Sequence, residues 1–306
     1  MNYGNILTKA WKTVWKHKVI FWFGMLMAIP SALMGIIMAG MFYSFSEEKL
    51  ISFFEGNSTE PDAFLLFFIL FFVGMILFTI LSYATMALSF AGTLKGTFEL
   101  KDKEITISFR ELWEASLPFV WRVFGIMAII FIGIFSFFAV IMFLGAIFGA
   151  VTAGIGFICL MPLILLIIPL ELLAFLFASI AMAVVVAEDI GVFDAMRKAK
   201  NLLKQNFWPL ILIGIIVGFI LWTVNMVAML PLQVAQFAFM MPMMSDPYMQ
   251  DPTAFFRPFS ILMAIMMPLI EIVQGLSLAY ANAVWIFSYF DITAKSENKE
   301  EVIEYV

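Results

Sequence analysis

The chain has 306 residues, of which 64% are hydrophobic and only 13% are charged, and its mean hydropathy is +1.04. Soluble domains are about half apolar and about one quarter charged, so this composition excludes a soluble enzyme and a disordered chain. The net charge of −5 provides no general attraction to nucleic acid, and the single cysteine (Cys159) and single histidine (His17) exclude a disulfide framework and a histidine-based metal cluster.

Stretches that are long and apolar enough to cross a membrane occur six times along the chain. A spanning helix needs about 20 mostly apolar residues. Such stretches run near 19–43, 63–93, 119–147, 155–187, 207–235 and 259–290. Several are longer than a bilayer requires, which predicts tilts and kinks, and residues 155–168 fit either a span or a re-entrant segment. The sequence therefore predicts an all-α, polytopic membrane helix bundle in a single integral membrane domain, 1–306.

Lysine and arginine are distributed unequally between the two ends of these stretches. Fifteen of the 17 lie before the first span, in the links between spans two and three and between spans four and five, and in the tail; the exceptions are Lys49 and Arg257. Because cytoplasmic loops are enriched in Lys and Arg, both termini are predicted to be cytoplasmic. The glycosylation sequon at Asn57 is interpreted as fortuitous, since we expect a prokaryotic cell-membrane protein.

A short amphipathic helix is expected before the first, third and fifth spans. The three helices align without gaps on Ala10, Ala115 and Ala199. In the first helix the predicted apolar face consists of Ile6, Leu7, Ala10, Trp11, Val14 and Trp15. Tryptophans and cations at the start of a span are typical of the headgroup level, where we also expect His17 to lie. The predicted interfacial lipid contacts are Trp11, Trp15, Lys12, Lys16, Lys198 and Trp208.

Helix, span, outer loop and span recur in this order, which predicts three repeat units at about 1–100, 105–187 and 188–295. The second spans also align: residues 81–85 match 278–282, and residues 181–183 match 281–283. Each unit begins and ends on the same side of the membrane. The repeats would therefore be parallel, with their symmetry axis along the membrane normal.

Three stretches resemble the membrane domain found in some glycerophosphoryl diester phosphodiesterases and in related uncharacterised multi-pass bacterial membrane proteins. They are ILTKAWKTVWKHKVIFWFG (6–24), AEDIGVFDAMRKAKNLLKQNFWPL (187–210) and SYFDI (288–292). The resemblance covers most of the chain, but its motifs are architectural. In fused family members a separate soluble domain performs the hydrolysis, and this chain ends soon after its last span. The resemblance therefore implies a membrane fold without phosphodiesterase activity.

Two carboxylates, Glu171 and Glu271, lie inside predicted spans at equivalent positions of the second and third repeat units, where the first unit has Gly74. A charge at bilayer depth costs about 3 kcal/mol or more, so such acids are candidates for function. Gln274 and Ser277 follow Glu271 at about one and two helical turns and complete the candidate intramembrane polar site. Two interpretations stay open: each acid is protonated and bonded to a neighbouring helix, or the acids form a transport or binding site.

Other polar and kinking residues surround this candidate site. Asn225 and Asn282 are interpreted mainly as hydrogen-bonding residues between helices. Pro162, Pro169 and Pro268 lie just outward of the two acids. Proline kinks a span, and broken helices near an intramembrane acid occur in transporters, although an interfacial segment fits the region around Pro162 equally well.

The sequence contains no P-loop, nucleophile elbow, zinc-protease motif or dinucleotide fingerprint. It is therefore predicted not to be an enzyme and to use no cofactor or metal. We interpret it as a non-catalytic membrane-embedded module that organises lipid or partner proteins. Its partners would be membrane lipids and an unidentified protein, not nucleic acid. The alternatives are a transporter or lipid-handling protein with a polar site at the paired acids, and an intramembrane hydrolase.

Overall fold

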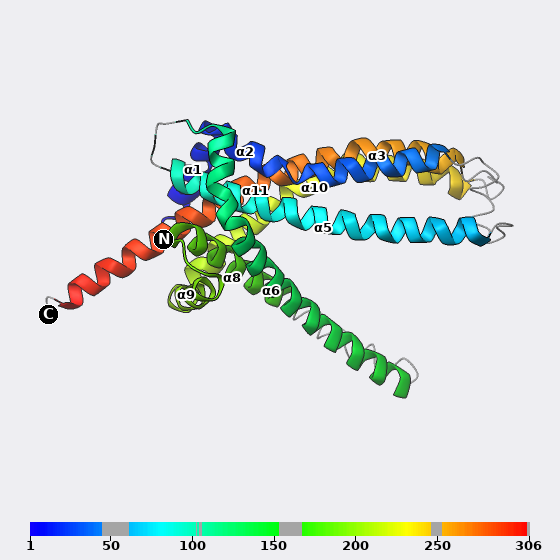
Figure 1. The fold of residues 1–306 in the computed structure, drawn as a ribbon. Helices are drawn as coiled ribbons and strands as arrows, with labels where there is room; N and C mark the ends of the chain where they lie inside the picture. The colour runs from blue at the N-terminus through cyan, green and yellow to red at the C-terminus, as the bar shows by residue number, and fades with distance from the viewer. Residues whose placement is uncertain (45–60, 102, 104–105, 153–166, 246–252, 305–306) are drawn as a thin grey trace. The chain divides into compact units, whose positions relative to one another are not determined.

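The computed structural model describes residues 1–44, 61–101, 103, 106–152, 167–245 and 253–304. In these residues the regular structure is α-helical (Figure 1), which confirms the predicted fold class. The helices are α1 (Tyr3–Lys16), α2 (Lys18–Met25), α3 (Ala28–Ser44), α5 (Pro61–Leu100), α6 (Phe109–Val151), α8 (Ile167–Glu188), α9 (Val192–Gln205), α10 (Phe207–Ser245) and α11 (Thr253–Glu304).

Six of the described segments are long and apolar enough to cross a membrane, and each coincides with a stretch expected from the sequence. They are Lys18–Ile37, Phe72–Leu100, Phe109–Val151, Pro169–Glu188, Phe207–Ala238 and Ser260–Ala294. Large apolar side chains such as Phe135, Phe143 and Phe219 remain exposed along them, as expected where lipid is the solvent. The chain is a multi-pass integral membrane protein. The part of the expected re-entrant segment from 155 to 166 lies outside the described residues.

The first span contains a break. Helix α2 ends at Met25 and α3 begins at Ala28, with a turn between them. Pro30, in the first turn of α3, has no N–H with which to bond the Leu26 carbonyl. That carbonyl accepts the N–H of Ile29 instead, at 3.2 Å. The single proline therefore gives a physical reason for the interruption.

The first and third amphipathic helices, α1 and α9, are separated from the spans that follow them. Each has 14 residues. The next residue, His17 after α1 and Asn206 after α9, leaves the helix while its N–H bonds back four positions at 3.0 Å. The buried positions also correspond: Ile6, Ala10 and Thr13 in α1, and Ala195, Ala199 and Leu202 in α9. Aligning Ala10 with Ala199 therefore matches two helices of equal length with the same buried face.

The second amphipathic segment is not a separate helix, which corrects the expectation of three separate interfacial helices. Ser108 and Glu111 form a capping box that starts α6, and the helix then continues without interruption to Val151. Pro118 lies inside it. Pro118 and Glu114 are both exposed, so the Glu114 carbonyl that loses its partner lies at the surface, and the helix tolerates the proline.

The chain folds into two compact units, each assembled from separate stretches of sequence. Unit 1 is Met1–Ile20, Phe90–Phe219 and Ala279–Val306, and unit 2 is Phe21–Ser89 and Ile220–Leu278. Fifteen of the 17 lysines and arginines belong to unit 1, and Lys49 and Arg257 belong to unit 2. The division into two units thus separates the segments that are rich in Lys and Arg from those that contain few. They differ from the three repeat units, which remain a prediction.

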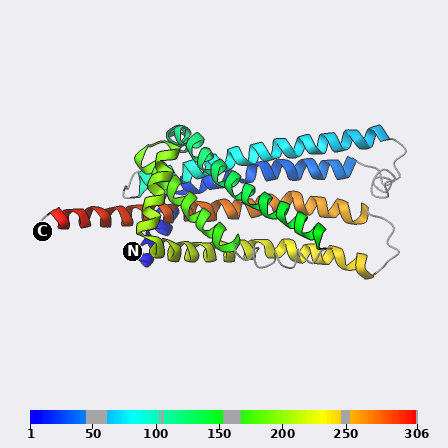
Figure 2. The same cartoon turned by 90° about the horizontal axis from the view of Figure 1, so that it is seen from below.

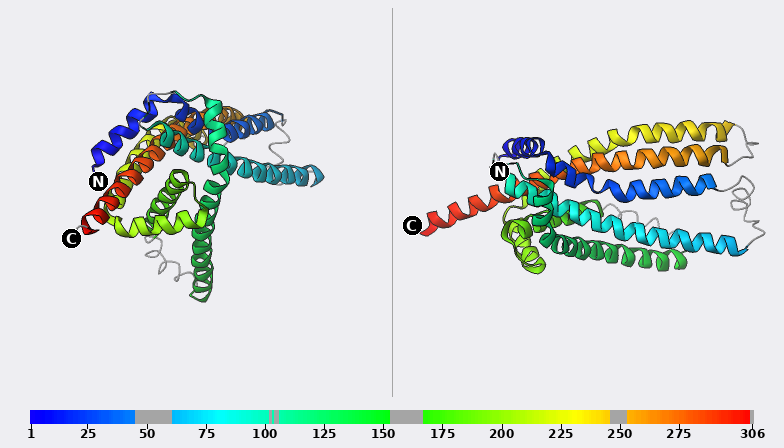
Figure 3. Two further views of the ribbon diagram at one scale, coloured as in Figure 1. Left: turned by 60° about the vertical axis from the view of Figure 1, so that its left-hand side comes forward. Right: turned by 45° about the horizontal axis from the view of Figure 1, so that its top comes forward.

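The core of unit 1 is built around α8, which packs against α6 and α9. Figure 3 shows α9 crossing beside α8. Residues 180–186 of α8 and 281–289 of α11 are buried without interruption. Both runs begin near pairs of alanines (181 and 183, 281 and 283), whose small side chains allow close helix approach.

In unit 2, α2 and α3 run antiparallel to α11 (Figure 2). A methyl group on Gly275 would lie 2.1 Å from the carbonyl oxygen of Gly24, and one on Gly35 would lie 2.8 Å from the Cα atom of Ala264. Backbone meets backbone at both points, so the first and last spans pack through glycine.

Candidate functional site

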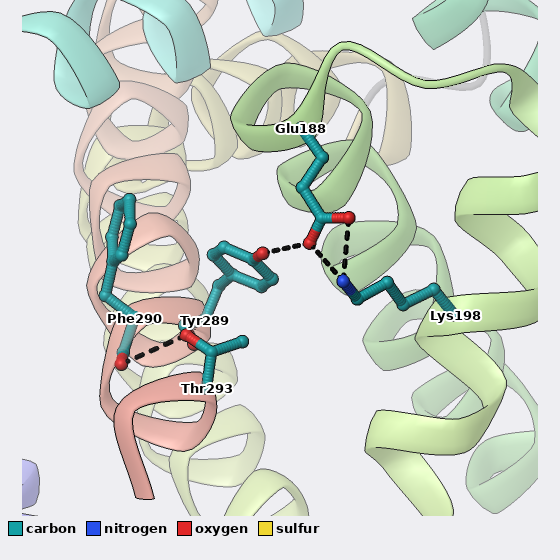
Figure 4. A network of polar contacts seen from close by, with 5 residues as sticks. All are labelled: Glu188, Lys198, Tyr289, Phe290 and Thr293. Atoms are coloured by element: carbon teal, nitrogen blue, oxygen red, sulfur yellow. Dashed lines mark hydrogen bonds and ion pairs between the residues drawn. The ribbon is translucent and has the colours of Figure 1, made fainter. Parts of the chain in front are cut away.

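One carboxylate at the end of α8 joins three helices of unit 1 (Figure 4). Glu188, the last residue of α8, accepts a hydrogen bond from the hydroxyl of Tyr289 on α11. The ammonium nitrogen of Lys198, on α9, lies 2.6 and 2.7 Å from the two carboxylate oxygens of Glu188. The Glu188 side chain is only 24% exposed. Partial shielding from water strengthens both interactions.

The turn between α8 and α9 is held by Arg122 of α6. Asp189 adopts the left-handed backbone conformation, with φ of 54°. Its N–H bonds the Val185 carbonyl at 3.1 Å. Arg122 donates to the Asp189 carboxylate and, at 3.5 Å, to the Ile190 carbonyl. Aspartate tolerates the left-handed conformation better than most residues, so this position suits it. The same turn therefore connects α6, α8 and α9.

Two of the three stretches singled out in the sequence, 187–210 and 288–292, meet in unit 1. Glu188 and Asp189 come from the stretch 187–210, and Tyr289 comes from 288–292. Trp11, from the first stretch, lies edge-on to Tyr280 of α11, with 5.9 Å between ring centroids. Sequence reasoning singled out these stretches but did not connect Glu188 with Tyr289. The two residues are 101 positions apart, and nothing local in the sequence indicates their contact.

A second buried polar contact joins α5 to α11. The Asn282 amide donates to the Thr93 hydroxyl at 2.7 Å, and both side chains are buried. The repeat alignment matches Asn282 with Thr85 instead, but the Thr85 hydroxyl bonds carbonyls of its own helix. The contact agrees with the interpretation of Asn282 as a residue that connects helices. It occurs about two turns along α5 from the aligned position.

The predicted lipid-contacting residues of α1 lie at the surface. Trp11 and Trp15 are 52% and 60% exposed, and their rings stack with centroids 5.2 Å apart. Lys12 and Lys16 are also exposed. The predicted apolar face therefore divides: Ile6, Ala10 and Val14 turn to the protein core, and the two tryptophans do not.

The two remaining predicted lipid contacts differ from each other. Trp208, at the start of α10, is 76% exposed and lies at the surface like the tryptophans of α1. Lys198 is 45% exposed, but its ammonium group is bound by Glu188. We therefore assign Lys198 first to the junction of α8 and α9.

His17 is buried, which corrects the expectation that it contacts headgroups. Its residue is only 5% exposed. Burial lowers the pKa of the imidazole, and the neighbouring charge of Lys16 lowers it further, while a hydrogen bond with the backbone of Lys103 acts in the opposite direction. His17 is therefore a neutral residue that ends α1 and packs in unit 1. The surrounding lysines concealed this role in the sequence.

The two intramembrane acids have different surroundings. Glu171 lies near the start of α8 and is exposed, whereas Glu271 lies within α11 and is half-buried. Glu171 belongs to unit 1 and Glu271 to unit 2. Along α8, Glu171 is about 25 Å from Glu188, at a rise of about 1.5 Å per residue. This length approaches the ~30 Å thickness of the hydrocarbon core, so Glu171 lies well away from the level of Glu188.

The residues that accompany Glu271 are also half-buried. The Ser277 hydroxyl donates to the Val273 carbonyl of its own helix at 2.8 Å. Ser277 therefore needs no hydrogen-bond acceptor from another helix. Gln274 lies about one turn from Glu271, as the spacing predicts.

Among the described residues, no group of three or more His, Cys, Asp and Glu side chains could hold a metal ion. No protein-family model matches this chain, and comparisons with curated proteins and with solved structures find no significant match. The functional interpretation consequently depends on the geometry.

Proposed function

We propose that this membrane protein is a non-catalytic, membrane-embedded module that organises lipid or a partner protein. It would lie in a prokaryotic cell membrane with its Lys- and Arg-rich segments and both termini in the cytoplasm. One observation carries the proposal: in unit 1 the described carboxylates of Glu188 and Asp189 hold helices together, while the aromatic and basic side chains of α1 stay exposed.

The acidic side chains near the amphipathic helices support a structural role. Besides the pairs at Glu188 and Asp189, the Glu99 carboxylate lies 3.2 Å from the Lys95 ammonium group one turn away. Arg110 and Glu114 form a similar pair at 2.9 Å. Carboxylates engaged with cations in this way connect parts of the fold, which suits helix packing.

The exposed face of α1 has the composition that binds anionic lipid. Three lysines (Lys9, Lys12 and Lys16) repeat along one side of the helix, next to the stacked Trp11 and Trp15. Each basic residue near an anionic membrane surface contributes about 1 kcal/mol of attraction. Tryptophan prefers the headgroup level. Lipid is therefore the first ligand that we assign to this face.

The test is the stability of the purified protein in nanodiscs of phosphatidylcholine with increasing phosphatidylglycerol. We expect the Tm of the wild type to rise with the anionic lipid. The triple variant K9A/K12A/K16A should lose most of that rise. The matched variant K9R/K12R/K16R keeps the charge and should retain it. An equal response in the alanine variant and the wild type would show that these lysines do not recruit anionic lipid.

The resemblance to the membrane domain of glycerophosphoryl diester phosphodiesterases is part of this proposal. Its support is that two of the resembling stretches meet in unit 1 through Tyr289 and Glu188, and that Trp11 of the remaining stretch contacts α11 at Tyr280. The equal length and matching buried faces of α1 and α9 support the repeat of the first and third units.

A transporter is the second candidate. The observation that favours it is the break between α2 and α3, which lies in the same compact unit as Glu271. Broken helices next to an acid near the membrane centre are typical of ion and substrate sites in transporters.

A further inference from the structure

Unit 2 brings a carboxylate to the break in the first span. The register between this span and α11 is determined at two points, where Gly24 meets Gly275 and Gly35 meets Ala264. The two helices are antiparallel, and the same number of residues separates the two contact points on each helix. Ala28, the first residue of α3, therefore falls opposite Glu271.

Glu271 also lies on the packed face of α11. One helical turn contains about 3.6 residues. Residues four, seven and eleven positions further along a helix therefore lie on the same face. On α11 this face contains Ala264, Pro268, Glu271 and Gly275. In α3 this face contains Ala28, Ser31 and Gly35, and Gly24 of α2 contacts Gly275 of α11 on the other side of the break. Ala28 and Ser31 are buried, which agrees with this assignment.

The break leaves backbone carbonyls at the end of α2 without regular helical partners. The carbonyls of Phe23 and Gly24 accept N–H groups only three positions ahead, at 3.3 and 3.4 Å. These bonds are longer than the usual ~2.9 Å. Free or weakly bonded carbonyls give the end of a helix a partial negative charge. This end of α2 is therefore suited to a cation.

Glu271 brings a second source of negative charge to the same level. It is half-buried, and within the described part of the chain its carboxylate makes no hydrogen bond or ion pair. An ionised carboxylate in apolar surroundings is costly without a partner. The Gly24 carbonyl, one helical turn away in this register, packs directly on Gly275.

We propose that the Glu271 carboxylate and the carbonyl oxygens at the end of α2 bind a sodium ion. Carboxylate and carbonyl oxygens are the hard ligands that such cations take, and unwound carbonyls coordinate sodium ions in broken transporter helices. One carboxylate neutralises one positive charge, so a monovalent ion leaves the site without net charge, unlike a divalent ion. The bound ion would connect the first and last spans. This inference goes beyond the proposed function and does not depend on it.

The experiment measures the Tm of the purified full-length protein in detergent at constant ionic strength, with sodium chloride replacing choline chloride. Sodium should raise the Tm of the wild type in a saturable manner, because a ligand that binds only the folded state stabilises it. The variant E271Q should lose this response. The variant E171Q changes the other intramembrane acid, in unit 1, and should keep it. The wild type should also bind radioactive sodium, and E271Q should lose this binding.

Equal Tm values of the wild type in sodium and choline chloride would overturn the proposal, and so would an undiminished sodium response in E271Q. A Tm that depends on pH but not on the cation would also overturn it, and would assign a proton to Glu271 instead. If E271Q does not fold, E271D keeps the charge on a shorter side chain. It should respond to sodium with a higher midpoint concentration, and an unchanged midpoint would contradict direct coordination.

Discussion

At the scale of single residues, Glu188 connects more elements of unit 1 than an ordinary surface ion pair does. Its carboxylate binds Lys198 from α9 and Tyr289 from α11. The exposed pair of Arg110 and Glu114 connects only neighbouring turns of α6. A hydrogen bond to a charged group contributes about 1.5–3 kcal/mol, whereas an exposed pair one turn apart contributes about 0.3–0.5 kcal/mol. The junction should therefore be sensitive to Glu188 and Tyr289.

The first prediction concerns this hydrogen bond. The substitution Tyr289→Phe should lower the free energy of unfolding by about 1–2 kcal/mol, because it removes a donor to a shielded carboxylate. In an E188Q background the same substitution should have a smaller effect, since the charged acceptor is gone. Unfolding in mixed micelles measures the effect of Y289F on the free energy of unfolding in both backgrounds.

The control is T293A, because the Thr293 hydroxyl bonds carbonyls of its own helix and should matter little. Equal effects of Y289F with and without E188Q would mean that Tyr289 stabilises α11 independently of Glu188.

The second prediction concerns His17 and pH. Its pKa in the folded protein is lowered by burial, while in the unfolded chain it is near 6.5. Below that pH the unfolded chain binds a proton that the folded protein does not, so stability falls as the pH decreases from about 6.5 towards the folded pKa. Between about pH 7.5 and pH 5.5, the Tm of the wild type should therefore decrease by more than the Tm of H17N. The ionisation of ordinary carboxylates changes little in this range.

Parallel pH profiles of the two proteins would contradict a buried, neutral histidine. Asparagine is the matched replacement because Asn206 occupies the corresponding position after α9.

At the scale of the elements, close backbone contact determines how the first and last spans pack in unit 2. The Gly24 carbonyl oxygen lies only 2.1 Å from the position that a Cβ atom at residue 275 would take. A side chain can rotate away from such a clash, but a backbone carbonyl inside packed helices cannot do so without moving the helix. Glycine at position 275 is therefore a packing requirement.

The third prediction follows from this contact. The substitution Gly275→Ala should destabilise the protein by about 1–3 kcal/mol, the usual cost of overpacking. The control, G74A, is in the same unit, where a Cβ atom meets nothing within 4 Å. Because alanine favours helix, G74A should be neutral or stabilising by up to about 1 kcal/mol. Thermal unfolding in detergent compares the two. A G275A protein as stable as the wild type would mean that α2 and α11 do not pack at this register.

The sequence predicted the spans well because a run of about 20 apolar residues has few alternatives to a membrane helix. It predicted the breaks poorly. His17 and Asn206 end their helices, whereas α6 continues through the aligned residue Arg122, and no local pattern distinguishes these positions. Pro30 was an available signal for the break in the first span, but Pro118 shows that a proline does not always end a helix.

At the scale of the whole molecule, the division into two compact units follows the division of charge. The segments of unit 1 contain fifteen lysines and arginines, and those of unit 2 contain two. The sequence reasoning used this charge distribution to predict orientation and did not predict the two compact units. It also did not predict the contacts inside unit 1. The bonds of Asn282 with Thr93 and of Tyr289 with Glu188 join residues 189 and 101 positions apart. Lys198 was assigned to lipid because its acidic partner, on another helix, could not be identified from spacing alone.

The central claim is that the Lys- and Arg-rich segments of a six-span protein face the cytoplasm. It is tested most directly by placing single cysteines at Lys103, Lys200 and Asp62 in a chain whose Cys159 is replaced by alanine. Intact cells are then treated with a membrane-impermeant thiol reagent. Because cytoplasmic segments are enriched in Lys and Arg, the cysteine at position 62 should react, and those at positions 103 and 200 should react only after the cells are lysed. Labelling at 103 and 200 but not at 62 in intact cells would reverse the orientation, and labelling of 103 and 62 together would contradict the arrangement of the spans.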